Sequence, residues 1–418
     1  MKLKMISLGC KVNQYEGRAI AEQFRLRGWE ETSEIADLCI INTCTVTTRA
    51  DAKSREAILR AKRQNQNALI AVCGCLTQLN GGAIKKLGVD FVIPQEKKHL
   101  LADIVTGVKN PIAQSRQKAR NIWSLTIDRF HNIRAFLKIQ DGCSNACAFC
   151  KIPHIRGVSQ SRTFKDTLRE AKRLSTHHPE IVLCGINLGL YGRDLTPPMS
   201  LAVLVKRLLA LPSLGRLRIS SLEPRSISKE LLRCFQHQAL CPHIHLPFQS
   251  GDDTVLSAMN KKDTVAHYEA VVDAFRAKHP HGAVSCDIMV GFPNETETAF
   301  KNTVDFLKRI KPMRTHVFAF SPREKTPLWN IPVPNQKILK ARSRVLTSLG
   351  RYFAHEYALQ CIGKKLHIVT EEFRNHETCG YTENYLKVCV QDKIPLGAIT
   401  PVRIARVTNS KIFAVLEK

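Results

Sequence analysis

The sequence predicts a multidomain α/β protein: an open parallel α/β sheet, a partial (β/α)6 barrel and a small antiparallel β-barrel. Three observations lead to this prediction. Apolar runs of strand length alternate with helix-length amphipathic stretches over residues 1–110. The same alternation returns six times from residue 133 onward. After residue 360 the apolar runs become short and alternate with a period of about two, as antiparallel strands do.

The chain of 418 residues is too long for a single core, so several domains are expected. The polar and basic stretch NPIAQSRQKARN has the composition of a linker. The predicted division is a first domain at 1–110, a linker at 111–132, a second domain at 133–335, a connecting helix at 336–359 and a last domain at 360–418.

The net charge and the cysteine content limit the classes of function and partner that the chain can have. Lys and Arg number 63 and Asp and Glu 36, a formal charge of +27, which indicates RNA or DNA as partner, with an acidic membrane surface as the alternative. No apolar run approaches the roughly 18 residues of a spanning helix, and the start MKLKMISLGC is interrupted too early for a signal peptide. We therefore expect a cytoplasmic protein without a membrane partner, whose 15 cysteines serve metal binding or catalysis rather than disulfides.

In the first domain, three cysteines each follow a predicted strand. Cys10 follows KLKMISL, Cys44 follows ADLCIIN and Cys75 ends the run ALIAVCGC. The carboxyl ends of parallel strands meet at one edge of a sheet, so topology should bring the three thiols together, as a three-cysteine metal cluster requires. Burial as ordinary core residues is the alternative. Cys39 and Cys73 lie inside strands and are expected in the core. Helices are predicted at 13–28, at 51–65, after the third strand and at 96–105, and a fourth strand at 89–94.

The second domain opens with DGCSNACAFC, which places Cys143, Cys147 and Cys150 on one short loop after the strand AFLKIQ. Three thiolates at this spacing suit three corners of a [4Fe-4S] cluster, and the fourth iron then stays open for chemistry. Structural burial is the alternative for any one cysteine. An open-sided barrel would admit a macromolecular substrate. Its predicted strands are 135–140, 180–186, 216–222, 243–249, 283–292 and 315–321, and its predicted helices are 167–178, 200–211, 229–236, 265–278 and 295–310, the last capped by Asn294 with Glu297.

The last domain has predicted strands at 364–372, 385–391, 401–407 and 411–417. A generic SH3-like or OB-like barrel would fit this pattern. Its Arg and Lys residues could follow a phosphate backbone.

The cysteine motifs SLGCKVNQYE, INTCTVT, VCGCLTQ and DGCSNACAFC together resemble those of the radical S-adenosylmethionine (SAM) methylthiotransferase family, and the resemblance covers nearly the whole chain. LGCKVNQYE is most similar to the branch acting on N6-threonylcarbamoyladenosine (t6A) in tRNA. The isopentenyladenosine branch more often has YGCQMN, and the ribosomal-protein branch LGCPKN. YTENYLKV and PVRIARV resemble the RNA-binding TRAM module.

The resemblance implies replacement of the C2 hydrogen of t6A at position 37 of tRNA by a methylthio group. In the family one SAM methylates sulfur at the N-terminal cluster and another supplies a 5′-deoxyadenosyl radical. Implied partners are the tRNA anticodon loop, an electron donor and a sulfur source. Implied ligands of two [4Fe-4S] clusters are Cys10, Cys44, Cys75, Cys143, Cys147 and Cys150, and implied SAM contacts are Phe149, Gly185, Glu223, Gln249 and Gly291.

Three points stay open at this stage. The same chemistry could act on isopentenyladenosine tRNA or on a ribosomal-protein Asp. In a different class, the chain could be an RNA-binding protein with structural or redox-sensing clusters. Lys325 stands where the family commonly has Gly, so a turn requiring positive φ would be strained there.

Overall fold

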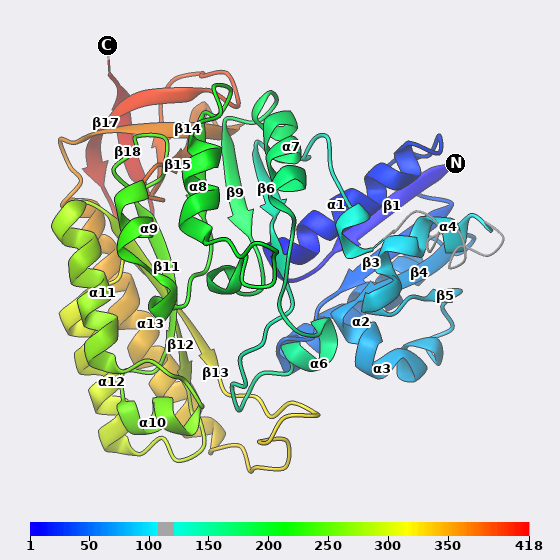
Figure 1. Cartoon of the computed structure of the whole chain (residues 1–418), viewed down its shortest axis with the longest axis horizontal. Coiled ribbons are helices and arrows are strands. Elements are labelled where there is room, and N and C mark those ends of the chain that lie inside the picture. The colour runs from blue at the N-terminus through cyan, green and yellow to red at the C-terminus, as the bar shows by residue number, and fades with distance from the viewer. Residues whose placement is uncertain (108–120, 418) are drawn as a thin grey trace.

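The N-terminal sheet is parallel throughout, as predicted. The computed structural model describes residues 1–107 and 121–417 (Figure 1). In sheet order, the strands are β2 (Glu30–Glu31), β1 (Lys2–Ser7), β3 (Leu38–Thr43), β4 (Leu69–Gly74) and β5 (Phe91–Val92). The helices are α1 (Lys11–Arg25), α2 (Thr48–Gln64), α3 (Cys75–Lys85) and α4 (Leu101–Val105), with a 3-10 turn η1 (Gln95–Leu100) before α4.

Alternate residues of the central strand β3 face opposite sides of this sheet. Cys39 and Ile41 pack with α2 and α3, whereas Ile40 packs with α1. Both Cys39 and Cys73 are buried core residues, as predicted. Helix α1 lies between the sheet and the central domain, where Tyr15 donates to Glu170 (Oη to Oε1, 2.6 Å).

The central domain has six parallel strands, as predicted. They form two three-stranded sheets joined by isolated parallel bridges, Leu217 to Leu240 and Ser221 to His245. The strands, in spatial order, are β6 (Arg134–Lys138), β9 (Glu180–Cys184), β10 (Arg216–Ile219), β11 (His243–Gln249), β12 (Ala283–Val290) and β13 (Arg314–Ala319).

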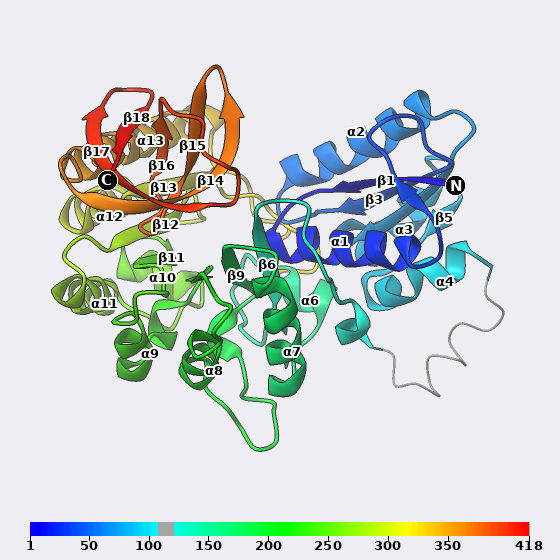
Figure 2. The same ribbon diagram turned by 90° about the horizontal axis from the view of Figure 1, so that it is seen from above.

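Helices cover the outside of these strands, and the long helix α13 packs along β13 (Figure 2). They are α7 (Phe164–Ser175), α8 (Leu201–Leu209), α9 (Lys229–Cys234), α10 (Asp253–Ala258), α11 (Val265–Lys278), α12 (Glu297–Ile310) and α13 (Gln336–Leu359). Shorter elements are β7 (Gln140–Asp141), β8 (Gln160–Ser161), α6 (Ile152–Arg156) and the 3-10 turns η2 (Ile122–Ser124), η3 (Leu188–Leu190) and η4 (Pro224–Ser226). The predicted cap of α12 is wrong: the Thr296 hydroxyl accepts from the N–H of Ala299, while Asn294 has φ +68° in the preceding turn.

The C-terminal domain is a closed five-stranded barrel. In barrel order the strands are β14 (Lys365–Arg374), β15 (Glu377–Thr382), β16 (Lys387–Val390), β18 (Ile412–Leu416) and β17 (Ile399–Val407). Four of its strand pairs are antiparallel and one, β16 with β18, is parallel. Strand β15 was not predicted, because its sequence ETCGYT lacks the apolar alternation.

A buried carboxylate attaches this barrel to the central domain. Glu180 on β9 accepts from Arg216 (Nε, 2.6 Å) and Arg218 (Nε, 2.8 Å), and the same guanidinium groups donate to the barrel carbonyls of Tyr381 (2.6 Å) and Glu383 (3.0 Å). Burial alone would raise the pKa of Glu180, but Arg218 and Arg216 hold it well below its usual range. The carboxylate therefore stays ionised and orients both arginines.

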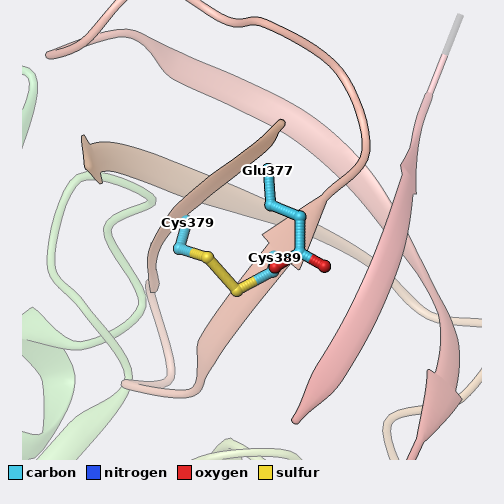
Figure 3. Close-up of side chains that lie close together, drawn as sticks. All are labelled: Glu377, Cys379 and Cys389. Carbon is cyan, nitrogen blue, oxygen red and sulfur yellow. A yellow bond between two sulfur atoms is a disulfide. The ribbon is translucent and has the colours of Figure 1, made fainter. Parts of the chain in front are cut away.

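A disulfide in the barrel corrects the expectation that cysteines here serve only metals or catalysis. Cys379 and Cys389 lie opposite each other on β15 and β16 and are bonded (Figure 3). A carboxylate oxygen of Glu377 lies within 4.8 Å of both sulfurs. Since metals bind thiolates, this trio is not a metal site while the two sulfurs are bonded to each other.

The N-terminal and central domains meet on a buried ionic network. Glu16 on α1 accepts from Lys98 (2.6 Å), from Lys138 on β6 (2.6 Å) and from Arg156 on α6 (2.9 Å), and Asp141 accepts from Lys138 (2.6 Å) and Arg156 (2.9 Å). All five side chains are buried. Burial opposes ionisation of Glu16, yet Arg156 and Lys138 hold its pKa well below the usual range. A charged Glu16 thus fixes the first domain against the second.

The first part of the predicted linker, 111–120, lies outside the described residues. Among the residues that are described, no helix combines the length and the apolar character needed to cross a membrane.

Replacing Glu16 by Gln should destabilise the protein strongly. The amide would leave Lys98, Lys138 and Arg156 with Asp141 as the remaining carboxylate of the network, and breaking a buried pair costs about 3–5 kcal/mol. Thermal unfolding followed by circular dichroism should show a clearly lower midpoint. Glu56→Gln, on the exposed face of α2, is the control and should leave the midpoint unchanged. Equal midpoints for both variants would contradict the assigned role of Glu16.

Replacing Lys325 by Gly should stabilise the protein slightly. Lys325 is exposed and has φ +65°, so the strain expected at this position is present. Relief of about 1–2 kcal/mol should exceed the greater flexibility of Gly in the unfolded chain, about 0.5–1 kcal/mol. Chemical denaturation should show a small rise in the midpoint. Lys325→Ala keeps the backbone strain and should leave the midpoint unchanged. A rise in the midpoint of both variants would show that loss of the lysine charge, and not relief of strain, stabilises the protein.

Candidate active site

The three N-terminal cysteines lie together at the carboxyl edge of the sheet, as the topology predicts. Cys10 caps the start of α1, Cys44 directly follows β3 and Cys75 begins α3. Gly9 lies against Cys44, and a Cβ on this glycine would approach the Cys44 Sγ to 2.7 Å. Burial, together with the neighbouring Cys75 and Cys10, raises the pKa of Cys44 to about 11. The three sulfur atoms are therefore close enough to interact electrostatically.

The second cysteine set lies on the loop between β7 and α6. This loop requires glycine at Gly142, where φ is +65° and a Cβ would lie 2.0 Å from the Val158 carbonyl oxygen. The N–H of Cys143 donates to the Gly157 carbonyl (3.1 Å). The N–H of Ala148 donates to the Met259 carbonyl (3.0 Å), which ties the loop to the end of α10.

Two of the three thiols on this loop have raised pKa values, and the three cysteines interact electrostatically. Burial raises the pKa of Cys147 to about 11 and that of Cys150 to about 12. Glu223 and the neighbouring Cys143 contribute to both increases in pKa, while Lys261 opposes the increase at Cys147. Deprotonating three clustered thiols at such a site requires a compensating positive charge.

Of the predicted SAM contacts, Phe149 lies on this loop and Gly291 lies beside it. The ring of Phe149 meets Phe292 edge-on, with centroids 6.5 Å apart, so Phe149 lies near the turn that contains Gly291. Gly291 has φ +71°, and its N–H donates to Glu295 (2.7 Å). A side chain at Gly291 would collide with Leu339, because a Cβ there would lie 1.9 Å from Leu339 Cδ2.

The other three predicted contacts have different surroundings. Glu223 is paired with Lys261 beside Cys147. Gln249 is buried with φ +70°, and its Oε1 has no hydrogen-bond partner in the described part of the chain. Gly185 lines a cavity together with Cys10.

Sequence reasoning missed Asn187, which connects the Gly185 turn to the cysteine loop. Its backbone N–H donates to the Gln140 side chain (2.7 Å), and its Nδ2 lies 3.8 Å from the Cys143 Sγ. An asparagine just after a barrel strand was the available signal, although it is a common turn residue.

Sequence reasoning also missed the contact that joins the two cysteine loops. Lys151, which follows Cys150, donates to the Thr45 hydroxyl (Nζ to Oγ1, 2.6 Å), and Thr45 follows Cys44. Arg323, from the loop after β13, donates to the Thr45 carbonyl (3.0 Å). Burial and the nearby Arg323 lower the pKa of Lys151 to about 8. Adjacency to the cysteines was the sole sequence signal for this contact.

Comparison with known proteins supports one family for the whole chain. The family described as "Uncharacterized protein family UPF0004" matches residues 2–94, and the radical SAM superfamily matches residues 137–307. The two matches contain the N-terminal and the central cysteine sets, respectively.

Full-length relatives extend this similarity. A threonylcarbamoyladenosine tRNA methylthiotransferase from Bacillus subtilis is 36% identical, over 96% of this chain and 93% of the relative. One from Thermotoga maritima is 33% identical, over 92% and 90%. A tRNA-2-methylthio-N6-dimethylallyladenosine synthase from Dictyoglomus thermophilum is 31% identical, over 99% and 97%.

Solved structures share the fold. A radical SAM methyltransferase from Kitasatospora setae superposes with a TM-score of 0.57 at 12% identity, covering 89% of this chain and 78% of that one. At this identity the likeness concerns architecture alone. The two family matches and the full-length relatives together show that this chain belongs to the radical SAM methylthiotransferase family.

Proposed function

We propose that this protein replaces the C2 hydrogen of t6A at position 37 of tRNA with a methylthio group. The observation that carries the proposal is the direct contact between the two cysteine loops through Lys151 and Thr45. A reaction that removes hydrogen at one site and delivers sulfur from another needs both sites to face one base. Relatives bearing the threonylcarbamoyladenosine name, at 31–36% identity, support this substrate.

Each cysteine set is proposed to hold a [4Fe-4S] cluster. Cys143, Cys147 and Cys150 would ligate one, and Cys10, Cys44 and Cys75 the other. The raised pKa values of Cys44, Cys147 and Cys150 fit this donor set, because iron supplies the positive charge that buried thiolates lack. When bound, SAM and these clusters would supply a carbon radical for an unactivated C–H bond and a holding site for sulfur.

The chain's own residues would position the cofactors. Phe149, Gly185, Glu223, Gln249 and Gly291 are proposed as SAM contacts. A side chain at Gly291 would collide with Leu339 and one at Gly185 with Leu188, so both turns require glycine, and the buried Gln249 Oε1 is free to accept a hydrogen bond. An electron donor and a sulfur source are further requirements of the proposed reaction.

The tRNA is proposed to bind along the C-terminal barrel. A groove of about 860 Å³ between α13 and the barrel is rich in cationic side chains. These are Arg351, Arg374, Lys387 and Lys411, of which Lys387 and Lys411 are paired with Glu372 and Glu377 of the same groove. With the excess of 63 basic over 36 acidic residues, such a groove suits a phosphate backbone. We therefore propose RNA binding for 360–418, radical chemistry for 133–335 and sulfur handling for 1–110. The reaction is proposed to take place in the cytoplasm, where tRNA is found.

Anaerobically reconstituted protein, given SAM and a reductant, should convert t6A-containing tRNA to its 2-methylthio form. Nucleoside mass spectrometry measures the product. Isopentenyladenosine tRNA serves as the matched substrate and should stay unmodified. Conversion of the isopentenyl substrate alone would replace the proposed substrate, and absence of 5′-deoxyadenosine would favour a binding protein with structural clusters.

Cysteine variants should separate the two proposed clusters. Cys147→Ala should lower iron from about eight to about four per chain and abolish SAM cleavage. Cys44→Ala should lose a similar amount of iron and all methylthio product but keep SAM cleavage. Cys234→Ala, on the outer helix α9, is the control and should keep both activities. Full product formation by Cys44→Ala would refute the second ligand set.

A further inference from the structure

A cavity of about 330 Å³ lies where all three domains meet. The N-terminal domain contributes Cys10 and Lys11, and the C-terminal barrel contributes Tyr385. The remaining walls come from the inner faces of the central strands, including Arg218, His243, Asp287 and Arg314. Its volume is at the lower end of the range for small-molecule sites, about 300–1,000 Å³.

Two half-buried cations of this cavity lack anionic partners. Neither Lys11 nor Arg314 has a hydrogen bond or ion pair with any residue that the structure describes, and Arg314 lies 5.2 Å from the ring centroid of Tyr385. Arg218 differs, because Glu180 and barrel carbonyls occupy its guanidinium group. Unpaired cations on the wall of a cavity attract an anion, and an Arg guanidinium can bind a carboxylate through two parallel hydrogen bonds.

A buried histidine adds an independent sign of a ligand. His243 is 3% exposed and lines the cavity. Its Nε2 lies 2.8 Å from the Ser285 hydroxyl, whereas its Nδ1 has no partner within the described residues. Burial, together with Arg218 and Arg314, lowers the pKa of His243 well below its usual range, so the ring is neutral. A neutral ring with one free nitrogen suits a polar, uncharged ligand group.

We propose that Arg314 and Lys11 bind the carboxylate of the threonylcarbamoyl group, so that this cavity selects the anionic base over a neutral one. The inference rests on the proposed function and deepens it. C2 and the N6-bearing carbon belong to the same adenine ring, so a base whose C2 is near Cys10 carries its N6 substituent into the same cavity. The threonyl group has a carboxylate and a hydroxyl, whereas a dimethylallyl group is a hydrocarbon that could use neither cation.

The first test changes the ligand and keeps the wild-type holoenzyme. Synthetic anticodon stem-loops would carry t6A, its methyl ester or isopentenyladenosine at position 37, and binding would be measured without oxygen at one fixed salt concentration. The t6A stem-loop should bind about 10- to 100-fold more tightly than the ester, the range for losing a hydrogen bond to a charged group. Equal affinities would overturn the inference.

The second test uses variants with the same three RNAs. Arg314→Leu and Lys11→Met, singly and together, should reduce or abolish the preference for t6A over its ester, and Arg314→Lys should keep part of it. Arg309→Leu, at an exposed position on α12, should keep all of it. Iron content and melting temperature identify variants that have misfolded. The comparison of t6A with its ester uses the wild-type protein, so it tests the inference even if every variant misfolds. An unchanged preference in the double variant would overturn the inference.

The two tests also distinguish this inference from the proposed function. Wild-type protein that converts the t6A stem-loop but binds its ester equally well would overturn the carboxylate site alone. Wild-type protein that prefers t6A but forms no methylthio product would uphold the carboxylate site and overturn the proposed reaction.

Discussion

The arrangement of this molecule depends on a carboxylate that two domains share. Glu16 belongs to the first domain, and two of its three cationic partners, Lys138 and Arg156, belong to the second. Moving the domains apart would leave buried charges unpaired, at a cost of several kcal/mol per ion. A salt bridge at the surface would give little resistance to such a movement. An ionic network is in general weak evidence for stability. Because this one is buried, however, it strongly constrains the relative position of the two domains.

That constraint has a chemical consequence, because Cys10 directly precedes α1, Glu16 lies in the second turn of the same helix, and Asp141 lies two residues before Cys143. The network therefore fixes the two cysteine sets through short and rigid connections. The Lys151–Thr45 contact fixes them a second time, directly. Two independent restraints on one separation are what a reaction needs when a small misplacement costs a large part of its rate.

Much of this could be predicted from sequence, since periodicity and topology are local properties. The alternation of strands and helices predicts the parallel strands of the first and central domains, and the strand ends bring Cys10, Cys44 and Cys75 together. Predictions failed where tertiary geometry decides. Strand β15 and the Cys379–Cys389 disulfide form because the barrel closes. The sequence of β15 itself has no apolar alternation from which this strand could be predicted. Arg314 looks like any strand arginine until the sheet, the first domain and Tyr385 enclose it.

The cationic residues of the groove and those of the cavity differ in how strongly solvent and salt screen their charges. Those of the groove beside the barrel, such as Arg374 and Lys387, face water, so salt screens them and they cannot distinguish one RNA from another. Arg314 and Lys11 are half-buried in the wall of a cavity, where an anion loses less of its attraction to screening and an uncharged group gains nothing from them. In the proposed scheme, affinity for RNA and choice of base are carried by different cations. Only the second group requires all three domains at once, which explains why the domains are held so rigidly together.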